Sequence, residues 1–195
     1  VAKAKVFGIS MGGMIAQELT MRHPEQVEKV VLGCTTPGGA NAVRPPDERI
    51  EQLMRGMELV QSDNLDAALD VMMPLLFPED FIANHPELRQ FMIAGLKMAP
   101  PPRWDVLEHT RAGALGFDAY DRLSQIKCPV LIVHGDKDVL APAENAILIK
   151  NRISQAELFM IPNAGHSFAA ADVVGIHQRI TQWLKGEAAV NDASS

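Results

Sequence analysis

A serine, an aspartate and a histidine follow one another along this chain in settings suited to covalent catalysis. Ser10 is the centre of Gly8-Ile9-Ser10-Met11-Gly12, which lies between the apolar pair Val6-Phe7 and a stretch with helical spacing. A G-x-S-x-G segment between a strand and a helix is typical of a nucleophile elbow, a strained turn that exposes the serine hydroxyl. We therefore expect Ser10 to be a nucleophile.

The residues around Ser10 have predicted roles of their own. Gly8 and Gly12 are expected to provide clearance, because a strand and a helix that turn this sharply leave no room for a Cβ between them. Met11 begins the helix, so its N–H has no acceptor within the helix and points to where an oxyanion would form. We predict Met11 N–H as an oxyanion-hole donor.

The aspartate and the histidine each follow a predicted strand. Asp136-Lys137-Asp138 comes after the buried strand 128–135, and His166 ends the loop Pro162-Asn163-Ala164-Gly165-His166 after the strand 158–161. In open parallel sheets, catalytic groups gather at the carboxyl ends of the strands. A neutral His166 would take the proton of Ser10, and Asp136 or Asp138 would fix its tautomer.

Parallel strands are expected because strand and helix patterns alternate at both ends of the chain. A helical pattern from Met11 to about Arg22 is closed by His23-Pro24, and the β-branched run 27–34 reads as a buried strand. Strand, helix and strand within about 30 residues predict a right-handed parallel unit. Further on, Pro142 is expected to open a helix to Arg152, and Asp172 to cap a last helix that ends at Gly186.

Between these parts, positions 47–117 favour helices without strands. The first predicted helix carries an apolar stripe of Ile50, Leu53, Met54 and Met57. The second is capped by Asn64 and stopped by Pro74, and the third begins at Pro86. The fourth contains Trp104, Leu107 and Arg111. Six of the ten methionines lie here. They either pack between short helices or line an adaptable apolar pocket.

Composition excludes several classes of function. With 47% apolar and 22% charged residues and a net charge of −6, the chain is an ordinary globular protein whose main partner is neither nucleic acid nor an anionic membrane. No signal peptide or spanning segment is present, so a cytoplasmic location is expected. Cys34 and Cys128 are expected at opposite edges of the sheet, too far apart for a disulfide. The histidines at 23, 85, 134 and 177 lack metal-ligand spacing, so neither a metal nor a cofactor is expected.

The three motifs in this order resemble the α/β-hydrolase fold, in particular its esterase, enol-lactonase and cofactor-free haloperoxidase-like group. The matching segments are 8–13, 129–142 and 163–166. The resemblance implies that Asp138, the second aspartate of the G-D-x-D segment, is the catalytic acid. It also implies a core of 1–36 and 121–187, a helical lid insertion at 37–120 and a flexible tail at 188–195.

The resemblance implies a serine hydrolase that cleaves small carboxylic esters or lactones through Ser10, His166, Asp138 and an acyl-enzyme. Two alternatives stay open. One is a catalytically weak or inactive homologue that binds ligands or signals, and the other is a cofactor-free perhydrolase.

One departure from the family pattern concerns the N-terminal side. Relatives carry further strands and a second oxyanion donor before the nucleophile, and we expect that portion to be missing here, which would impair activity by about 10²–10³-fold. The strand at 4–9 would then be an open sheet edge. We expect it to pair with a second copy, with a separate upstream chain or with the remainder of the protein.

Overall fold

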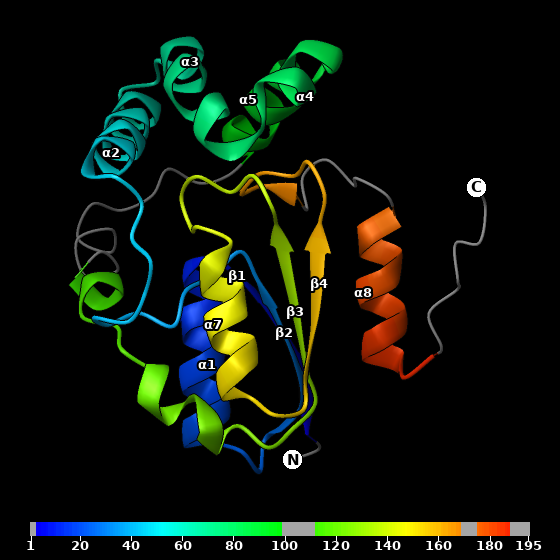
Figure 1. Cartoon of the computed structure of the whole chain (residues 1–195). Helices are drawn as coiled ribbons and strands as arrows, with labels where there is room; N and C mark the ends of the chain where they lie inside the picture. The colour runs from blue at the N-terminus through cyan, green and yellow to red at the C-terminus, as the bar shows by residue number, and fades with distance from the viewer. Residues whose placement is uncertain (1–2, 99–111, 169–174, 188–195) are drawn as a thin grey trace.

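Four parallel strands form the centre of the molecule (Figure 1). The structure is a computed structural model that describes residues 3–98, 112–168 and 175–187. The strands are β1 (Ala4–Ile9), β2 (Val27–Gly33), β3 (Val130–Gly135) and β4 (Ala156–Ile161), and they neighbour one another in sequence order. All three pairings are parallel, which confirms the predicted α/β sheet.

Helices cover both faces of this sheet, as Figure 1 shows. α1 (Met11–Arg22) and α7 (Glu144–Arg152) lie on one face, and α8 (Ile176–Lys185) lies on the other. The alternation of side chains along a strand explains the two layers, since Val30 packs in the cluster with α1 and α7 while Val31 packs with α8. Burial on both faces is why β2 and β3 read as continuous apolar runs.

A group of helices lies above the carboxyl ends of the strands (Figure 1). This helical region consists of α2 (Asp47–Gln61), α3 (Leu65–Leu76), α4 (Glu79–Asn84) and α5 (Leu88–Met98). It has an apolar cluster of its own, whose buried members are Leu69, Met73, Phe77 and Leu88. A 3₁₀ helix, η1 (Tyr120–Gln125), leads from this part back into β3.

One prediction for the helical region was wrong, and one helix was missed. Pro74 does not stop α3 but lies inside it, and the helix continues to Leu76 because Leu75 is buried and Phe77 N–H still donates to Met73 O at 2.9 Å. Packing here outweighs the lost proline N–H. The short helix α4 was not predicted at all.

Other predictions were close. Asn64 caps α3 by accepting from Ala67 N–H at 3.4 Å, and Gly186 ends α8 with a φ of 79°. The predicted fourth helix, with Trp104 and Leu107, and the Asp172 cap lie outside the described residues. Cys34 and Cys128 are free thiols, as expected. None of the described helices combines the length and apolarity that crossing a bilayer requires.

An ion pair joins η1 to α1 and makes stability depend on pH. The hydrogen bond from Arg122 lowers the pKa of Glu18 from 4.5 to about 2, with a second contribution from Arg22. Because the folded pKa is below the unfolded one, the stabilisation is complete above pH 4.5 and is lost as the pH falls towards 2.

We predict that Glu18→Gln lowers the free energy of unfolding at pH 7 by about 0.5–1 kcal/mol, since the pair is partly exposed to solvent. The difference from the native chain should shrink between pH 4.5 and pH 2 in thermal or urea unfolding. The exposed Glu51→Gln on α2 is the control. An equal loss at pH 7 and at pH 2 would contradict this account.

Candidate active site

Ser10 lies in a strained turn between β1 and α1. Its φ of 55° and ψ of −120° are rarely adopted by a residue with a side chain. The turn is held by its own backbone, because Ser10 N–H donates to Gly33 O at 2.8 Å and Ser10 O accepts from the Thr35 hydroxyl at 2.7 Å. Gly13 N–H and Met14 N–H also donate to Ser10 O. The geometry is that of the elbow predicted from the sequence.

Of the two glycines predicted to give clearance, the structure supports only one. A Cβ on Gly8 would collide with the carbonyl of Gly12, so Gly8 must lack a side chain. At Gly12 the same position is open space, contrary to the prediction. The second close approach is at Gly13 instead, where a Cβ would lie 2.6 Å from the Cβ of Thr35. The helix therefore packs on the loop after β2 one residue later than expected.

Met11, the predicted oxyanion donor, is the first residue of α1. The first-turn N–H groups of Gly13 and Met14 are satisfied by Ser10 O. An N–H at the first helical position has no acceptor within the helix, and it lies at the positive end of the helix dipole. The position therefore fits the predicted role.

Asp138 is a buried carboxylate with donors on both oxygens. Its Oδ1 accepts from Leu140 N–H at 2.9 Å and from Ala141 N–H at 2.8 Å, and its Oδ2 accepts from His166 Nδ1 at 2.8 Å. Burial by itself raises the pKa of Asp138, but the hydrogen bonds from His134 and His166 more than reverse this and hold the pKa well below its usual value. Asp138 is therefore ionised, whereas the other candidate, Asp136, is exposed, and the hydrogen bond of His166 Nδ1 goes to Asp138.

The loop that carries His166 is fixed from two sides. Ala164 O accepts from Lys137 N–H at 2.9 Å, which ties the loop to the segment after β3. Ser167 N–H donates to Leu76 O at 3.0 Å, and Asn163 Nδ2 donates to Asp80 Oδ2 at 2.7 Å. The loop is thus held by the end of α3 and by α4 as well as by the sheet.

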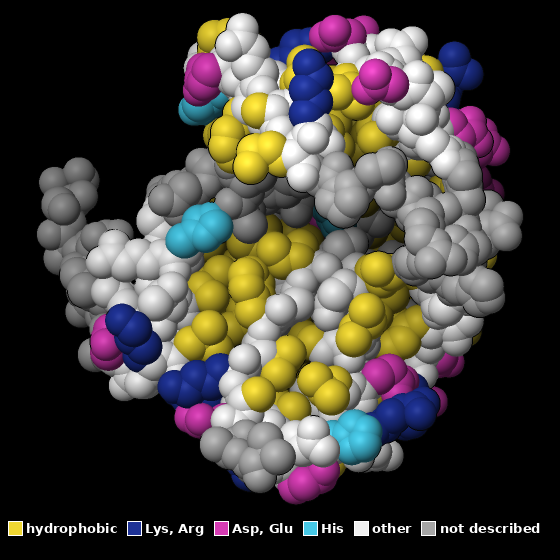
Figure 2. All heavy atoms as spheres, turned by 180° about the vertical axis from the view of Figure 1, so that it is seen from behind, with side chains coloured by type: hydrophobic (Ala, Val, Ile, Leu, Met, Phe, Trp, Pro, Cys, Tyr) yellow, Lys and Arg dark blue, Asp and Glu magenta, His cyan; other side chains and the backbone are white. Residues whose placement is uncertain are grey.

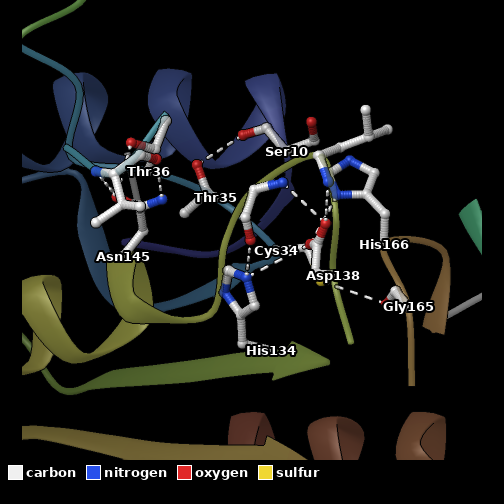
Figure 3. A network of polar contacts seen from close by, with 12 residues as sticks. Ser10, Cys34, Thr35, Thr36, His134, Asp138, Asn145, Gly165 and His166 are labelled. Atoms are coloured by element: carbon white, nitrogen blue, oxygen red, sulfur yellow. Dashed lines mark hydrogen bonds and ion pairs between the residues drawn. The ribbon is translucent and has the colours of Figure 1, made fainter. Parts of the chain in front are cut away.

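This loop also bridges the width of the sheet. β1 and β4 are its two outer strands, so Ser10 and the start of the loop are separated by β2 and β3. The loop then turns back, since Gly165 O lies 3.9 Å from Cys34 Sγ after β2 and Phe168 packs against Gly33. Figure 3 shows Ser10, His166 and Asp138 at the same end of the sheet.

Sequence reasoning missed two groups that lie under Asp138. His134 at the end of β3 is fully buried, and its Nε2 is 3.4 Å from Asp138 Oδ2 and 2.7 Å from Ala141 O (Figure 3). Cys34 is buried beside them, and burial together with the charge of Asp138 raises the pKa of its thiol. The only signal was the four-residue spacing of His134 and Asp138 across a strand end.

Cys34, His134 and Asp138 are also the one group of potential metal ligands found among the described residues, with ligand atoms within 4.8 Å of one another. They do not fit a metal ion well. His134 Nε2 faces a carbonyl oxygen and so carries a hydrogen, and Asp138 Oδ2 is occupied by His166. The cluster is better explained as support for the carboxylate.

One cavity lies along α1, next to the elbow residue Met11, and another is lined by Asp138. The first, of about 310 Å³, is mainly apolar and is lined by Met11, Met14, Ile15, Glu18, Gly113, Ala114 and Phe117. The second, of about 750 Å³, lies between Asp138 and the helical region. Hydrophobic side chains gather on the face shown in Figure 2, and the exposed apolar residues of β1 and α1 include Phe7 and Ile15, 43% and 59% exposed.

Of the six methionines predicted as core or as pocket, two pack in the helical region. Met73 is buried in the apolar cluster of the helical region and Met92 packs against it, which is the packing role. The methionines that line the apolar cavity beside the elbow are Met11 and Met14 of α1. The methionines of this cavity therefore come from α1, whereas positions 47–117 contribute Gly113, Ala114 and Phe117 to its lining.

Comparison with known proteins identifies relatives for nearly the whole chain. Residues 2–170 match the family model described as serine aminopeptidase, S33. A putative carbamate hydrolase of Caulobacter sp. is 28% identical over 96% of this chain and 67% of its own length. A pimeloyl-[acyl-carrier protein] methyl ester esterase of Nitrosospira multiformis is 30% identical over 83% of this chain and 60% of its own.

Solved structures agree with these relatives. A thermophilic esterase from Thermogutta terrifontis superposes with a TM-score of 0.69 and 27% identity, covering 95% of this chain and 65% of the esterase. The predicted α/β-hydrolase fold is thereby confirmed. The chain spans about two thirds or less of the length of these three proteins.

The glycine contacts at the elbow lead to a test of its packing. We predict that Gly8→Ala destabilises the fold by about 1–3 kcal/mol, because the new methyl group forces the backbone of Gly12 to move. Gly12→Ala meets open space and should be neutral or stabilising, since alanine is the better helix former. Thermal unfolding compares the two variants. Equal stabilities of the two variants would show that Gly8 of β1 does not lie against the Gly12 carbonyl of α1.

Proposed function

The chain belongs to the serine aminopeptidase S33 family of α/β-hydrolase-fold proteins, and from this premise we propose that it is a serine hydrolase of small carboxylic esters or lactones. Ser10 would be the nucleophile, His166 the general base and acid, and Asp138 the residue that orients His166. The observation that carries the proposal is the 2.8 Å hydrogen bond between His166 Nδ1 and the buried Asp138, at the sheet end where Ser10 occupies a strained turn.

The proposed reaction follows from that hydrogen bond. The carboxylate of Asp138 only accepts, so His166 Nδ1 carries the hydrogen and Nε2 has a free lone pair. His166 Nε2 takes the hydroxyl proton of Ser10 while Ser10 Oγ attacks the carbonyl carbon of the ester. His166 then gives this proton to the leaving alkoxide. Water then repeats these steps on the acyl-enzyme. Met11 N–H would stabilise the negative oxygen in both steps.

The apolar cavity beside the elbow supports the proposed substrate class. Met11, Met14 and Ile15 of the nucleophile helix give this cavity a mainly apolar lining, with Glu18 as the one charged residue among the described residues that line it, which suits an uncharged alkyl or acyl group. Two of the relatives carry names that describe ester cleavage, and a third is named for carbamates. We further propose that 37–120 acts as a lid, because the helical region stands over the strand ends.

A partner for β1 remains part of the proposal. Among the described residues β1 pairs only with β2, and Phe7 on this strand is 43% exposed. An open strand edge with exposed apolar side chains favours pairing with another strand. We propose a second copy, a separate upstream chain or the remainder of the protein as the source of that strand, and the same source for a second oxyanion donor. The cytoplasmic location likewise stays a prediction.

The hydrolase proposal predicts that Ser10→Ala lowers the hydrolysis of short and medium aryl esters by at least about 10³-fold. The exposed Ser62→Ala is the matched control and should retain the native rate. Equal rates for Ser10→Ala and the native chain would reject the serine hydrolase and favour the alternative of an inactive homologue that binds ligands. Peracid formation from acetate and hydrogen peroxide, measured beside ester hydrolysis, tests the perhydrolase alternative.

A second pair of variants tests which aspartate acts with His166. We predict that Asp138→Asn lowers kcat by about 10⁴-fold, because the amide favours the wrong imidazole tautomer. Asp136→Asn should change kcat by no more than about threefold, since Asp136 is exposed and makes no contact with His166. The opposite ranking in steady-state kinetics would assign the acid to Asp136.

A further inference from the structure

The two oxygens of Asp138 are bound unequally. Oδ1 is held by the backbone N–H groups of Leu140 and Ala141, which belong to the same loop and cannot be changed by a side-chain substitution. Oδ2 is shared between side chains, with His166 Nδ1 at 2.8 Å and His134 Nε2 at 3.4 Å. The negative charge that Asp138 Oδ2 offers to His166 therefore depends on the interaction of His134 Nε2 with the same oxygen.

The tautomer of His134 follows from its surroundings. Ala141 O lies 2.7 Å from Nε2 and can only accept, so Nε2 carries a hydrogen. Nδ1 is buried and has no hydrogen-bond partner among the described residues, so a hydrogen there would be buried without an acceptor. His134 is thus a neutral imidazole whose Nε2–H donates to Ala141 O, and the same Nε2 lies 3.4 Å from Asp138 Oδ2 (Figure 3).

We propose that His134 is a positioning residue of the proposed triad, whose Nε2–H keeps Asp138 Oδ2 turned towards His166 and withdraws part of its charge. This inference rests on the proposed function. His134 does not touch a substrate in this account and acts only through Asp138. By sharing Oδ2, His134 leaves His166 less negative charge at that oxygen than a carboxylate with a single imidazole partner would offer.

Other titratable groups face Asp138 as well. Cys34, after β2, is a buried thiol whose pKa is raised by burial and by this carboxylate, so it stays uncharged. The cavity between Asp138 and the helical region is lined by further charged groups, namely Arg49, Glu79, Asp80, Asp136, Lys137 and Glu144. None of these is changed by a substitution at His134, so the test below isolates the shared oxygen.

The test compares two substitutions of one residue. His134→Gln keeps an N–H donor near the position of Nε2, and His134→Leu removes it. In His134→Leu we expect the titration midpoint of His166, followed by NMR, and the acid limb of kcat/KM to move up by about 0.5–1 pH unit, while His134→Gln stays within about 0.2 unit of the native chain. Thr20→Val, which loses another buried hydrogen bond on α1, is the control for a general loss of stability.

Several outcomes would overturn the inference. They are a shift below about 0.2 unit or a downward shift in His134→Leu, an equal shift in His134→Gln, or a similar shift in Thr20→Val. Nitrogen chemical shifts of the native chain must also show His134 with its hydrogen on Nε2, and a hydrogen on Nδ1 would refute the geometry without any variant. If His134→Leu does not fold, His134→Met removes the same donor and is judged by the same criteria.

The experiment also separates this inference from the proposed function. A native chain without Ser10-dependent ester hydrolysis would refute the hydrolase. The titration of His166 would still report whether His134 governs the charge at Asp138 Oδ2, because that measurement needs no substrate.

Discussion

The buried charge of Asp138 is the constraint on which the rest of this structure depends. Moving a carboxylate out of water costs several kcal/mol unless donors replace the lost hydration. Here the donors are Leu140 and Ala141 from its own loop, His134 from β3 and His166 from the loop after β4. Four groups from three segments can meet one carboxylate only if the ends of β3 and β4 are in fixed register, which the parallel pairing from Val130 to Gly135 provides.

The loop after β4 also reaches back to the end of β2, the strand that neighbours the elbow strand β1. The segment after β4 packs Phe168 on Gly33 at the end of β2, and its Gly165 lies against Leu76 at the end of α3. Both contacts are made at a glycine, because a Cβ on Gly33 would crowd the ring of Phe168 and a Cβ on Gly165 would collide with the carbonyl of Leu76. Close packing at Gly33, Gly165 and Phe168 therefore fixes the backbone of the loop that carries His166.

Much of the fold was predictable because its signals are local. The strands β2 and β3 are continuous apolar runs, the elbow has its two-glycine pattern, and Gly186 marks a helix end. What failed depends on tertiary contacts. Pro74 is tolerated because Leu75 is buried beneath it, and Gly13 is tight because Thr35 approaches from another segment. The contact between His134 and Asp138 was hidden for the same reason, since the two side chains meet only after the chain has turned.

The contacts between the helical region and the histidine loop have a consequence for how such a protein can change. Asp80 of α4 binds Asn163, and Leu76 at the end of α3 binds Ser167, one residue from the proposed base. Evolution or engineering that reshapes α3 and α4 to admit a different molecule therefore also moves the imidazole. In the proposed hydrolase, selectivity and turnover would be mechanically linked, and Met11, Met14 and Ile15, which line a separate cavity, would offer another route to new specificities.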